Sequence, residues 1–456
     1  MPLQKNQVLT LRVERLSSDG SGVAHSPDGE TVFIPGAAPG DEARVRIVKD
    51  CKRYAFGILD EVLTPSPDRI PVDCAVAGPC GGCSLRHLDY AAELRAKQEN
   101  VADAFARIGG LAVPVLPIVG SPEVNRYRNK VQFPVGVDKS GKPCIGFYAG
   151  RTHRIVPCPD CRLQPGVLNE IGNALCAFFA EKGIQPYSEE TGRGLVRHIF
   201  LRRGAHSGQI MVCLVCTRAK LPSAEELCTR LKAQFAEITT ILLNVNAKNT
   251  NVILGTETHT LYGQGYIEDT LCGVPVQLGP LSFYQVNTLA AEQLYGIAAQ
   301  YAQLTPDDLL LDLYCGMGTI GLSMAAHCRE LIGVEIVPEA IESAKANAAR
   351  MGADVAAKSR FFCADAGQAA TRLAAEGLHP DIVMLDPPRK GCDEATLSAV
   401  VRMSPRRVVY VSCNPATAAR DAAWLEQNGY HAEKVQPVDL FPRTRHCECV
   451  LSFSKV

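Results

Sequence analysis

The stretch Leu309-Leu-Leu-Asp-Leu-Tyr-Cys-Gly-Met-Gly-Thr-Ile-Gly321 decides the fold class of this 456-residue chain. It starts as a short apolar run and passes through a turn in which Gly316, Gly318 and Gly321 have the spacing Gly-x-Gly-x-x-Gly. A strand, a glycine-rich turn and a helix in this order are typical of a nucleotide-binding α/β sheet. The pattern alone admits a nicotinamide or flavin nucleotide as well as adenosyl-methionine, so a nucleotide-dependent oxidoreductase is one alternative.

Further apolar runs recur around this stretch, with helical segments such as 338–351 between them. Their spacing predicts a doubly wound parallel sheet, the arrangement of a class I Rossmann-like domain, which we assign to residues 281–456. Residues 432–438 and 447–453 predict an antiparallel hairpin added at its end. The expected parallel strands are 309–314, 330–335, 360–365, 381–386 and 407–412.

Composition places the chain among soluble globular proteins of two to four domains, because 46% of its residues are hydrophobic and 21% are charged. It contains no apolar run of 18 residues, so we expect no membrane span. The first residues form no apolar signal segment, which assigns the 19 cysteines to a reducing, cytoplasmic compartment. With a net charge of −1, contacts with nucleic acid must come from local patches.

Two domains are expected before the doubly wound domain. Residues 1–64 predict a small OB-like β-barrel from runs at 8–13, 31–34, 43–48 and 56–59, with Arg44, Arg46 and Lys49 on one strand face. Residues 65–280 predict a mixed α+β domain, in which 126–130 combines three cations with Tyr127. Residues 193–220 hold six Lys or Arg and no acid, so this domain is expected to carry a polynucleotide.

Cysteines cluster in the pattern Cys74-x5-Cys80-Gly-Gly-Cys83. Three thiols at this spacing are typical of a metal or iron–sulfur site, and the fourth ligand has two candidates, Cys158 and Cys161. Zinc is the alternative to an iron–sulfur cluster, and a third interpretation leaves the thiols without a metal.

Two motifs around the sheet point to group transfer from adenosyl-methionine. Asp312 and Glu335, at the glycine turn and at the end of the next strand, suit the amino-acid moiety and the ribose hydroxyls of that molecule. Asp386-Pro-Pro-Arg389 places a carboxylate on a loop that two prolines hold open. Amino methyltransferases have an aromatic residue where Arg389 stands, so Arg389 points away from nitrogen as the acceptor.

Ser412-Cys413-Asn414-Pro415 follows the last parallel strand and has two interpretations, a buried core thiol or a nucleophile. A nucleophile makes chemical sense because C5 of a pyrimidine accepts a methyl group only after a thiolate has added to C6. A base must then remove the C5 proton. His446 and Glu448 offer that base, and alternation predicts both on one strand face with Cys447 on the other.

The order of these motifs resembles the RNA uracil-5-methyltransferase family: Ser282–Asn287, Asp312–Leu322, Asp386–Gly391, Ser412–Pro415 and Phe441–Glu448. Residues 1–64, with 20–24 and Pro39-Gly40 in the expected places, resemble a TRAM domain, an RNA-binding barrel. Together with the cysteine group, the chain is most similar to the branch that acts on 23S ribosomal RNA.

The resemblance implies Cys413 as the nucleophile, Glu448 as the base, and a target uridine flipped out of a folded RNA. It implies no obligate protein partner, and we expect a monomer. Cys161 is preferred over Cys158 because a short apolar stretch follows the corresponding cysteine of the family, and Cys161-Arg-Leu-Gln fits that pattern better than Cys158-Pro-Asp. The alternatives are a tRNA uracil-5-methyltransferase and a non-catalytic RNA-binding iron–sulfur protein. The remaining implied sites are contacts to S-adenosyl-L-methionine by Gln285, Tyr314, Glu335 and Asp386, and a [4Fe-4S] cluster on Cys74, Cys80, Cys83 and Cys161.

Overall fold

The structure, a computed structural model, describes residues 3–150 and 152–456 and divides into two compact units. The first unit combines the chain up to Ala77 with Gly81–Val124 and Leu385–Val456, and the second combines Gly78–Cys80 with Asn125–Met384. This grouping differs from the three domains expected from the sequence, and those boundaries stay a prediction. No helix in the described part of the chain is long and apolar enough to cross a membrane.

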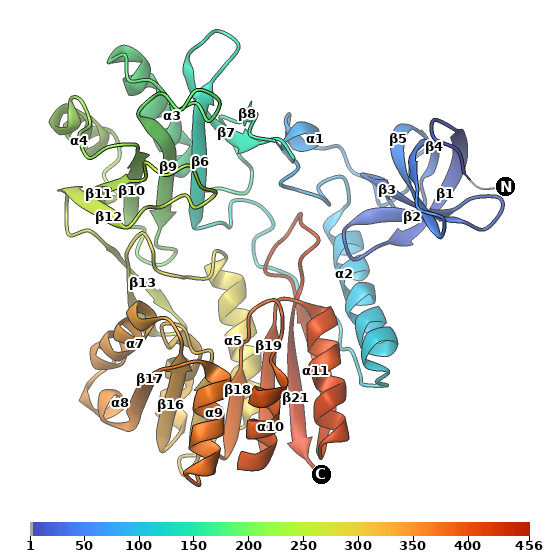
Figure 1. Ribbon diagram of the computed structural model, residues 1–456, viewed down its shortest axis with the longest axis vertical. Coiled ribbons are helices and arrows are strands. Elements are labelled where there is room, and N and C mark those ends of the chain that lie inside the picture. The colour runs from blue at the N-terminus through green and yellow to red at the C-terminus, as the bar shows by residue number, and fades with distance from the viewer. Residues whose placement is uncertain (1–2, 151) are drawn as a thin grey trace. The chain divides into compact units, whose positions relative to one another are not determined.

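The first unit begins with a closed five-stranded barrel in the order β1-β2-β3-β5-β4 (Figure 1, blue). Alternate residues point inward, so Val32, Ile34 and Val45 are fully buried. Gly57 lets two strands approach, because a Cβ there would lie 2.3 Å from a methyl group of Val45. The barrel predicted for residues 1–64 is confirmed, with strands β1 (Val8–Leu16), β2 (Ser21–His25), β3 (Thr31–Pro35), β4 (Glu42–Asp50) and β5 (Tyr54–Thr64).

The rest of the first unit contains helix α2 (Tyr90–Ala104), a π-helical turn (Phe105–Gly109) and three sheet strands in the order β19-β21-β20. The Asp89 side chain caps α2 by accepting from the backbone amide of Ala92. Strand β21 is antiparallel to both of its neighbours, as the predicted final hairpin requires. The elements are α10 (Glu394–Met403), β19 (Arg407–Ser412), α11 (Pro415–Gln427), β20 (Tyr430–Val438) and β21 (Glu448–Lys455).

A buried ionic network joins α2 to the segment between β20 and β21. Lys97 Nζ donates to Glu93 Oε1 at 2.8 Å and to Asp439 Oδ1 at 2.7 Å, and all three side chains are at most 2% exposed. The Tyr90 hydroxyl donates to the second Asp439 oxygen, and the Arg443 amide donates to Glu93. The segment that leads into β21 is therefore fixed by charges from a helix more than 300 positions earlier in the chain.

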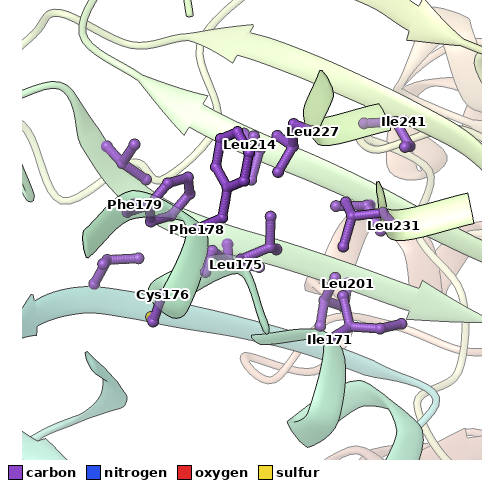
Figure 2. Packing of buried hydrophobic residues seen from close by; sticks show 14 of the residues in the cluster. Ile171, Leu175, Cys176, Phe178, Phe179, Leu201, Leu214, Leu227, Leu231 and Ile241 are labelled. Atoms are coloured by element: carbon purple, nitrogen blue, oxygen red, sulfur yellow. The ribbon is translucent and has the colours of Figure 1, made fainter. Parts of the chain in front are cut away.

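The second unit contains a seven-stranded sheet in the order β12-β11-β10-β9-β6-β7-β8. Helices α3 (Gly166–Glu181) and α4 (Ala224–Gln234) pack on it, and Figure 2 shows Phe178, Leu175 and Leu231 among the strand residues of the shared core. Its strands are β6 (Lys130–Val137), β7 (Pro143–Tyr148), β8 (Ile155–Pro157), β9 (Val196–Arg203), β10 (Ile210–Cys216), β11 (Ile238–Val245) and β12 (Glu257–Tyr262). The mixed α+β character predicted for this region is confirmed.

The second unit ends in α/β structure, after a hairpin of β13 (Ile267–Leu271) and β14 (Val274–Leu278). Strands β17, β16 and β15 are parallel neighbours, and β18 follows them in the order. This confirms the predicted parallel sheet. Its elements are α5 (Thr288–Ala302), β15 (Leu309–Leu313), α6 (Thr319–Met324), a 3-10 turn (Ala325–His327), β16 (Glu330–Glu335), α7 (Pro338–Arg350), α8 (Ala353–Lys358), β17 (Ser359–Cys363), α9 (Ala366–Ala375) and β18 (Ile382–Leu385).

Replacement of Lys97 by Met is expected to lower the free energy of unfolding of the first unit by about 3–5 kcal/mol, because two buried carboxylates lose their cation. Chemical denaturation monitored by circular dichroism measures this. Arg95→Met is the matched control, since Arg95 lies on the same helix, pairs with Asp68 and is 57% exposed. Its expected cost is below about 1 kcal/mol, and equal costs for the two variants would contradict the network's importance.

Candidate functional site

Cys413 directly follows strand β19, and Glu448 is the first residue of the neighbouring strand β21. Strands β19 and β21 are paired in register from Arg407 opposite Ser454 to Ser412 opposite Cys449. One further step in this register places Cys413 opposite Glu448, and side chains at opposite positions of an antiparallel pair lie on the same face. Cys413 is half-buried and Glu448 is buried, so the thiol that the sequence singled out is not sealed in the core.

The Ser412-Cys413-Asn414-Pro415 motif folds as a strand end that turns directly into helix α11. The Asn414 side chain caps the helix by accepting from the Ala416 amide, and Pro415 occupies the first helical turn, where no amide donor is needed. The Ser412 hydroxyl donates to the Asn414 carbonyl at 3.1 Å. Cys413 is thus held between a hydrogen-bonded serine and a helix cap.

The proline loop after β18 is tied to the same helix. The Arg389 carbonyl accepts from Asn414 Nδ2 at 3.0 Å and from the Thr417 hydroxyl at 3.4 Å. Gly391 has φ +79°, and a Cβ there would lie 2.6 Å from a carboxylate oxygen of Asp421, so this close approach requires glycine. The loop and the cysteine motif therefore form one fixed structure.

Burial and neighbouring negative charges raise the pKa values of the acidic groups at this site. Burial raises the pKa of Glu448 to about 8, and the negative charge of Asp386 adds to this rise. Burial alone raises the pKa of Asp386 to about 7. Burial and the charges of Glu448 and Asp386 raise the pKa of Cys413 to about 11. The Arg389 charge acts against these shifts at both Cys413 and Glu448.

The effect of Arg389 on the site is an addition of the structure. The sequence marked Arg389 only as a departure from the aromatic residue of amino methyltransferases, not as a positive charge that acts on Cys413 and Glu448.

The glycine turn of the second unit follows β15. Tyr314, Gly316 and Gly318 all have positive φ, of 65°, 55° and 80°. Positive φ is uncommon for tyrosine and is found where the surrounding structure imposes it, frequently at ligand sites. Glu335, at the end of β16, accepts from the Gly316 amide at 3.2 Å and from the Val337 amide at 2.9 Å. The turn and the strand-end carboxylate that the sequence paired are therefore brought together.

Asp312 is buried beneath this turn and hydrogen-bonds to its backbone. Its side chain is 1% exposed, and Oδ2 accepts from the Gly321 amide at 3.0 Å. A Cβ at Gly321 would lie 2.8 Å from that oxygen, so the third glycine of the motif serves close packing. Asp312 thus holds the start of helix α6, rather than facing solvent as a ligand group.

Gln285 lies on the segment between β14 and α5. Asn129 fixes its backbone, donating from Nδ2 to the Gln285 carbonyl at 2.7 Å and from its own amide to the Val286 carbonyl. The Asn287 side chain then caps α5. Gln285, Tyr314 and Glu335 all belong to the second unit, whereas Asp386 belongs to the first.

The predicted [4Fe-4S] ligand set is not gathered in the structure: within residues 3–150 and 152–456, no three His, Cys, Asp or Glu side chains form a group able to hold a metal ion. Two of the predicted ligands nevertheless have polar partners. A hydrogen bond from Cys158, with backbone amides, lowers the pKa of Cys161 to about 6 despite burial. The Arg86 guanidinium interacts with the Cys83 sulfur. Helix α1 (Ala77–Cys80), between the first ligands, contains no buried residue.

Three expectations about individual residues are corrected. His446 precedes β21, so it does not share a strand face with Glu448 as alternation predicted. Tyr127 is 5% exposed, which leaves its ring unable to stack on a base. Arg197 and Arg202 are also buried, so residues 193–220 present fewer surface cations than the sequence indicated. The last two corrections share a physical reason, because charge and aromatic content do not reveal which side of a strand or loop is covered.

Comparisons with known proteins cover the whole chain. Residues 204–456 match the tRNA (Uracil-5-)-methyltransferase family, and residues 2–59 match the TRAM domain. An uncharacterized RNA methyltransferase of Halalkalibacterium halodurans is 43% identical over 98% of this chain and 97% of its own length. One of Bacillus cereus is 41% identical over 100% of this chain and 98% of its own.

A solved structure is similar as well. The crystal structure of Pyrococcus abyssi tRNA (uracil-54, C5)-methyltransferase in complex with S-adenosyl-L-homocysteine has a TM-score of 0.78 and 26% sequence identity to this chain. The match covers 98% of this chain and 100% of that one.

Glu448→Gln is expected to stabilise the protein increasingly between about pH 4.5 and pH 8. The raised pKa of about 8 means that the folded state favours the protonated carboxyl, so the native protein loses stability as pH rises through this window. Glutamine removes that loss, and the gain should reach up to about 4 kcal/mol above pH 8 and vanish near pH 4. Urea denaturation across this pH range measures it, with Glu99→Gln on the exposed face of α2 as control. A pH-independent difference would contradict the assignment.

Proposed function

Because the chain belongs to the tRNA (uracil-5-)-methyltransferase family, we propose that it transfers a methyl group from S-adenosyl-L-methionine to C5 of a uridine in 23S ribosomal RNA. The reaction proceeds through a covalent bond between Cys413 Sγ and C6 of the uracil. The observation that supports this proposal is the register of β19 and β21, which ends one step before Cys413 and Glu448, together with the effect of the Glu448 charge on the Cys413 thiol. Family membership also removes the nucleotide-dependent oxidoreductase as an alternative.

Cys413 supplies the nucleophile. Its thiolate adds to C6, and the electron pair of the C5–C6 double bond moves toward C5 and O4. Bound adenosyl-methionine supplies an electrophilic methyl group, which C5 accepts. Arg389 favours the thiolate form of Cys413, whereas the charges of Asp386 and Glu448 oppose it. Protonation of these two carboxyl groups in the free protein therefore assists the first step, and Glu448 then releases its proton to solvent before it acts as the base.

Glu448 closes the cycle. Its carboxylate removes the proton from C5, the C5–C6 double bond forms again, and Cys413 leaves as a thiolate. A general base works best when its pKa lies near the working pH, because enough of it is ionised and the ionised form is still basic. The pKa of Glu448, about 8, meets this condition. His446, outside strand β21, has no part in this scheme.

The cofactor contacts follow from the turn geometry. Gly316 and Gly318 leave the backbone open for the amino-acid end of adenosyl-methionine, and Tyr314 is held in its strained conformation beside them. Glu335 retains lone pairs for the ribose hydroxyls after it has fixed the turn. Gln285 and Asp386 complete the proposed set.

The RNA class has two candidates. The cysteine group favours 23S ribosomal RNA, as the sequence indicated. A tRNA substrate is favoured by the Pyrococcus abyssi tRNA enzyme, whose match extends over 98% of this chain and so includes the barrel. The barrel therefore does not separate the two candidates.

Cells that lack this protein are expected to lose 5-methyluridine from 23S ribosomal RNA and to keep it in tRNA. Wild-type protein should restore the modification, Cys413→Ala should leave it absent, and Cys363→Ala, which alters an exposed cysteine of the second unit, should restore it fully. Mass spectrometry of nuclease digests from purified RNA fractions measures this. Loss from tRNA alone would transfer the proposal to the second candidate.

A trapped adduct separates the chemistry from simple misfolding. RNA containing 5-fluorouridine has no C5 proton to remove, so wild-type protein should remain covalently attached to it. Cys413→Ala should form no adduct, and an adduct that survives this change would refute the mechanism. Glu448→Gln should accumulate a methylated adduct with unmodified RNA as well. A non-catalytic RNA-binding protein would form neither species.

The cysteine set is proposed to hold a [4Fe-4S] cluster that orders the segment around α1. This segment lacks a buried residue of its own, and ligation of the kind proposed couples directly to local folding. The lowered pKa of Cys161 and the contact of Arg86 with Cys83 support iron ligation. The cluster has no electron-transfer role in the proposed reaction, because the methyl transfer is balanced without one.

Protein purified without oxygen is expected to be brown and to contain about four iron and four sulfide ions per chain. Cys161→Ala should lose the iron, whereas Cys158→Ala should keep it. Iron and sulfide analysis with visible absorption measures both. Colourless protein with one zinc ion per chain would refute the iron–sulfur assignment.

A further inference from the structure

Three aromatic side chains gather on the outside of the barrel in the first unit. The Tyr54 ring lies 5.7 Å from that of Phe33 and 5.6 Å from that of Phe56, and the two phenylalanine rings are 5.8 Å apart. Phe33 and Phe56 are directly paired across strands β3 and β5. Tyr54 is 40% exposed, and both phenylalanines are partly exposed. We call Phe33, Tyr54 and Phe56 the barrel aromatic cluster.

The cluster does not belong to the barrel core. The residues next to its members in the strands, Val32, Ile34 and Ala55, are fully buried and point inward, so the three rings point outward by strand alternation. Ile58, the next outward residue of β5 after Phe56, is 48% exposed. Outward aromatic rings on neighbouring strands of an OB-like barrel are a stacking surface for bases.

Cations border the cluster. Lys49 is paired with Phe56 in the register of β4 and β5, and Lys52 and Arg53 immediately precede Tyr54. All three are exposed, and none takes part in an ion pair within the described residues, in contrast to Arg44 and Arg46 on β4, which are paired with acids of β5. The positive face predicted for β4 is therefore reduced to the end beside the aromatic rings.

We propose that the barrel aromatic cluster binds unpaired bases of the substrate RNA, at a distance along the chain from the reacting uridine, with Lys49, Lys52 and Arg53 on the adjoining phosphates. Stacking accepts any base, so this site adds affinity for single-stranded RNA without reading its sequence. Duplex RNA is excluded because its bases are already stacked on one another. The inference rests on the proposed RNA substrate, and it is independent of the chemistry at Cys413.

The test uses the full-length protein and single-stranded oligo(A). This RNA contains no uridine, so its binding does not depend on the proposed methyl transfer. Tyr54→Ala is expected to raise the Kd roughly tenfold, within the range of a lost base stack. Ile58→Ala, which removes exposed aliphatic surface on the same strand, should change it less than about twofold. Equal effects of the two variants would overturn the proposal.

Two further measurements identify the contact as stacking. Tyr54→Trp should retain wild-type affinity, and its additional fluorescence should be quenched by oligo(A) but not by duplex RNA; the wild-type chain contains a single Trp for reference.

Tyr54→Ala should keep the salt dependence of binding, whereas the double change Lys52→Ala and Arg53→Ala should reduce its slope by about one to two. Quenching by duplex RNA to the same extent, or a reduced slope in Tyr54→Ala, would refute base stacking.

Discussion

The position of Glu448 depends on the buried contact between Lys97 and Asp439. Lys97 holds the loop between β20 and β21 by donating to the Asp439 carboxylate and to the Phe441 carbonyl. Strand β21 begins immediately after this loop. A buried ion pair is costly unless every partner is present, so the network favours a single geometry of this loop. Glu448 follows the loop directly, and its position therefore depends on that geometry. The proposed chemistry thus relies on a helix that contributes no reacting group.

A second constraint is the low polarity around the reacting groups. Burial raises the pKa of Cys413, Glu448 and Asp386 together, and like charges reinforce the effect. The protein therefore bears a free-energy cost at neutral pH for every charge placed there. This cost is useful for a nucleophile and a base that must change protonation state in turn. Arg389 limits it, because its charge acts on both the thiol and the glutamate.

The two units supply different parts of the proposed reaction. The first unit holds Cys413, Glu448 and the proline loop, together with the barrel aromatic cluster. The second unit holds the glycine turn and Glu335. The residues proposed to react with the uracil and those proposed to bind single-stranded RNA thus belong to one unit, and the proposed cofactor turn belongs to the other.

The sequence by itself determined the barrel, the parallel α/β strands and the identity of Cys413 and Glu448 as candidates, because strand alternation, glycine spacing and proline loops are local properties of a chain. It did not reveal that Tyr127 is buried or that Arg389 acts on Cys413. The tertiary structure alone decided the register that sets Cys413 opposite Glu448 and the ion network of Lys97. These depend on contacts between residues far apart in the chain, and desolvation, which sets their energies, is a property of the folded surroundings rather than of the residue type.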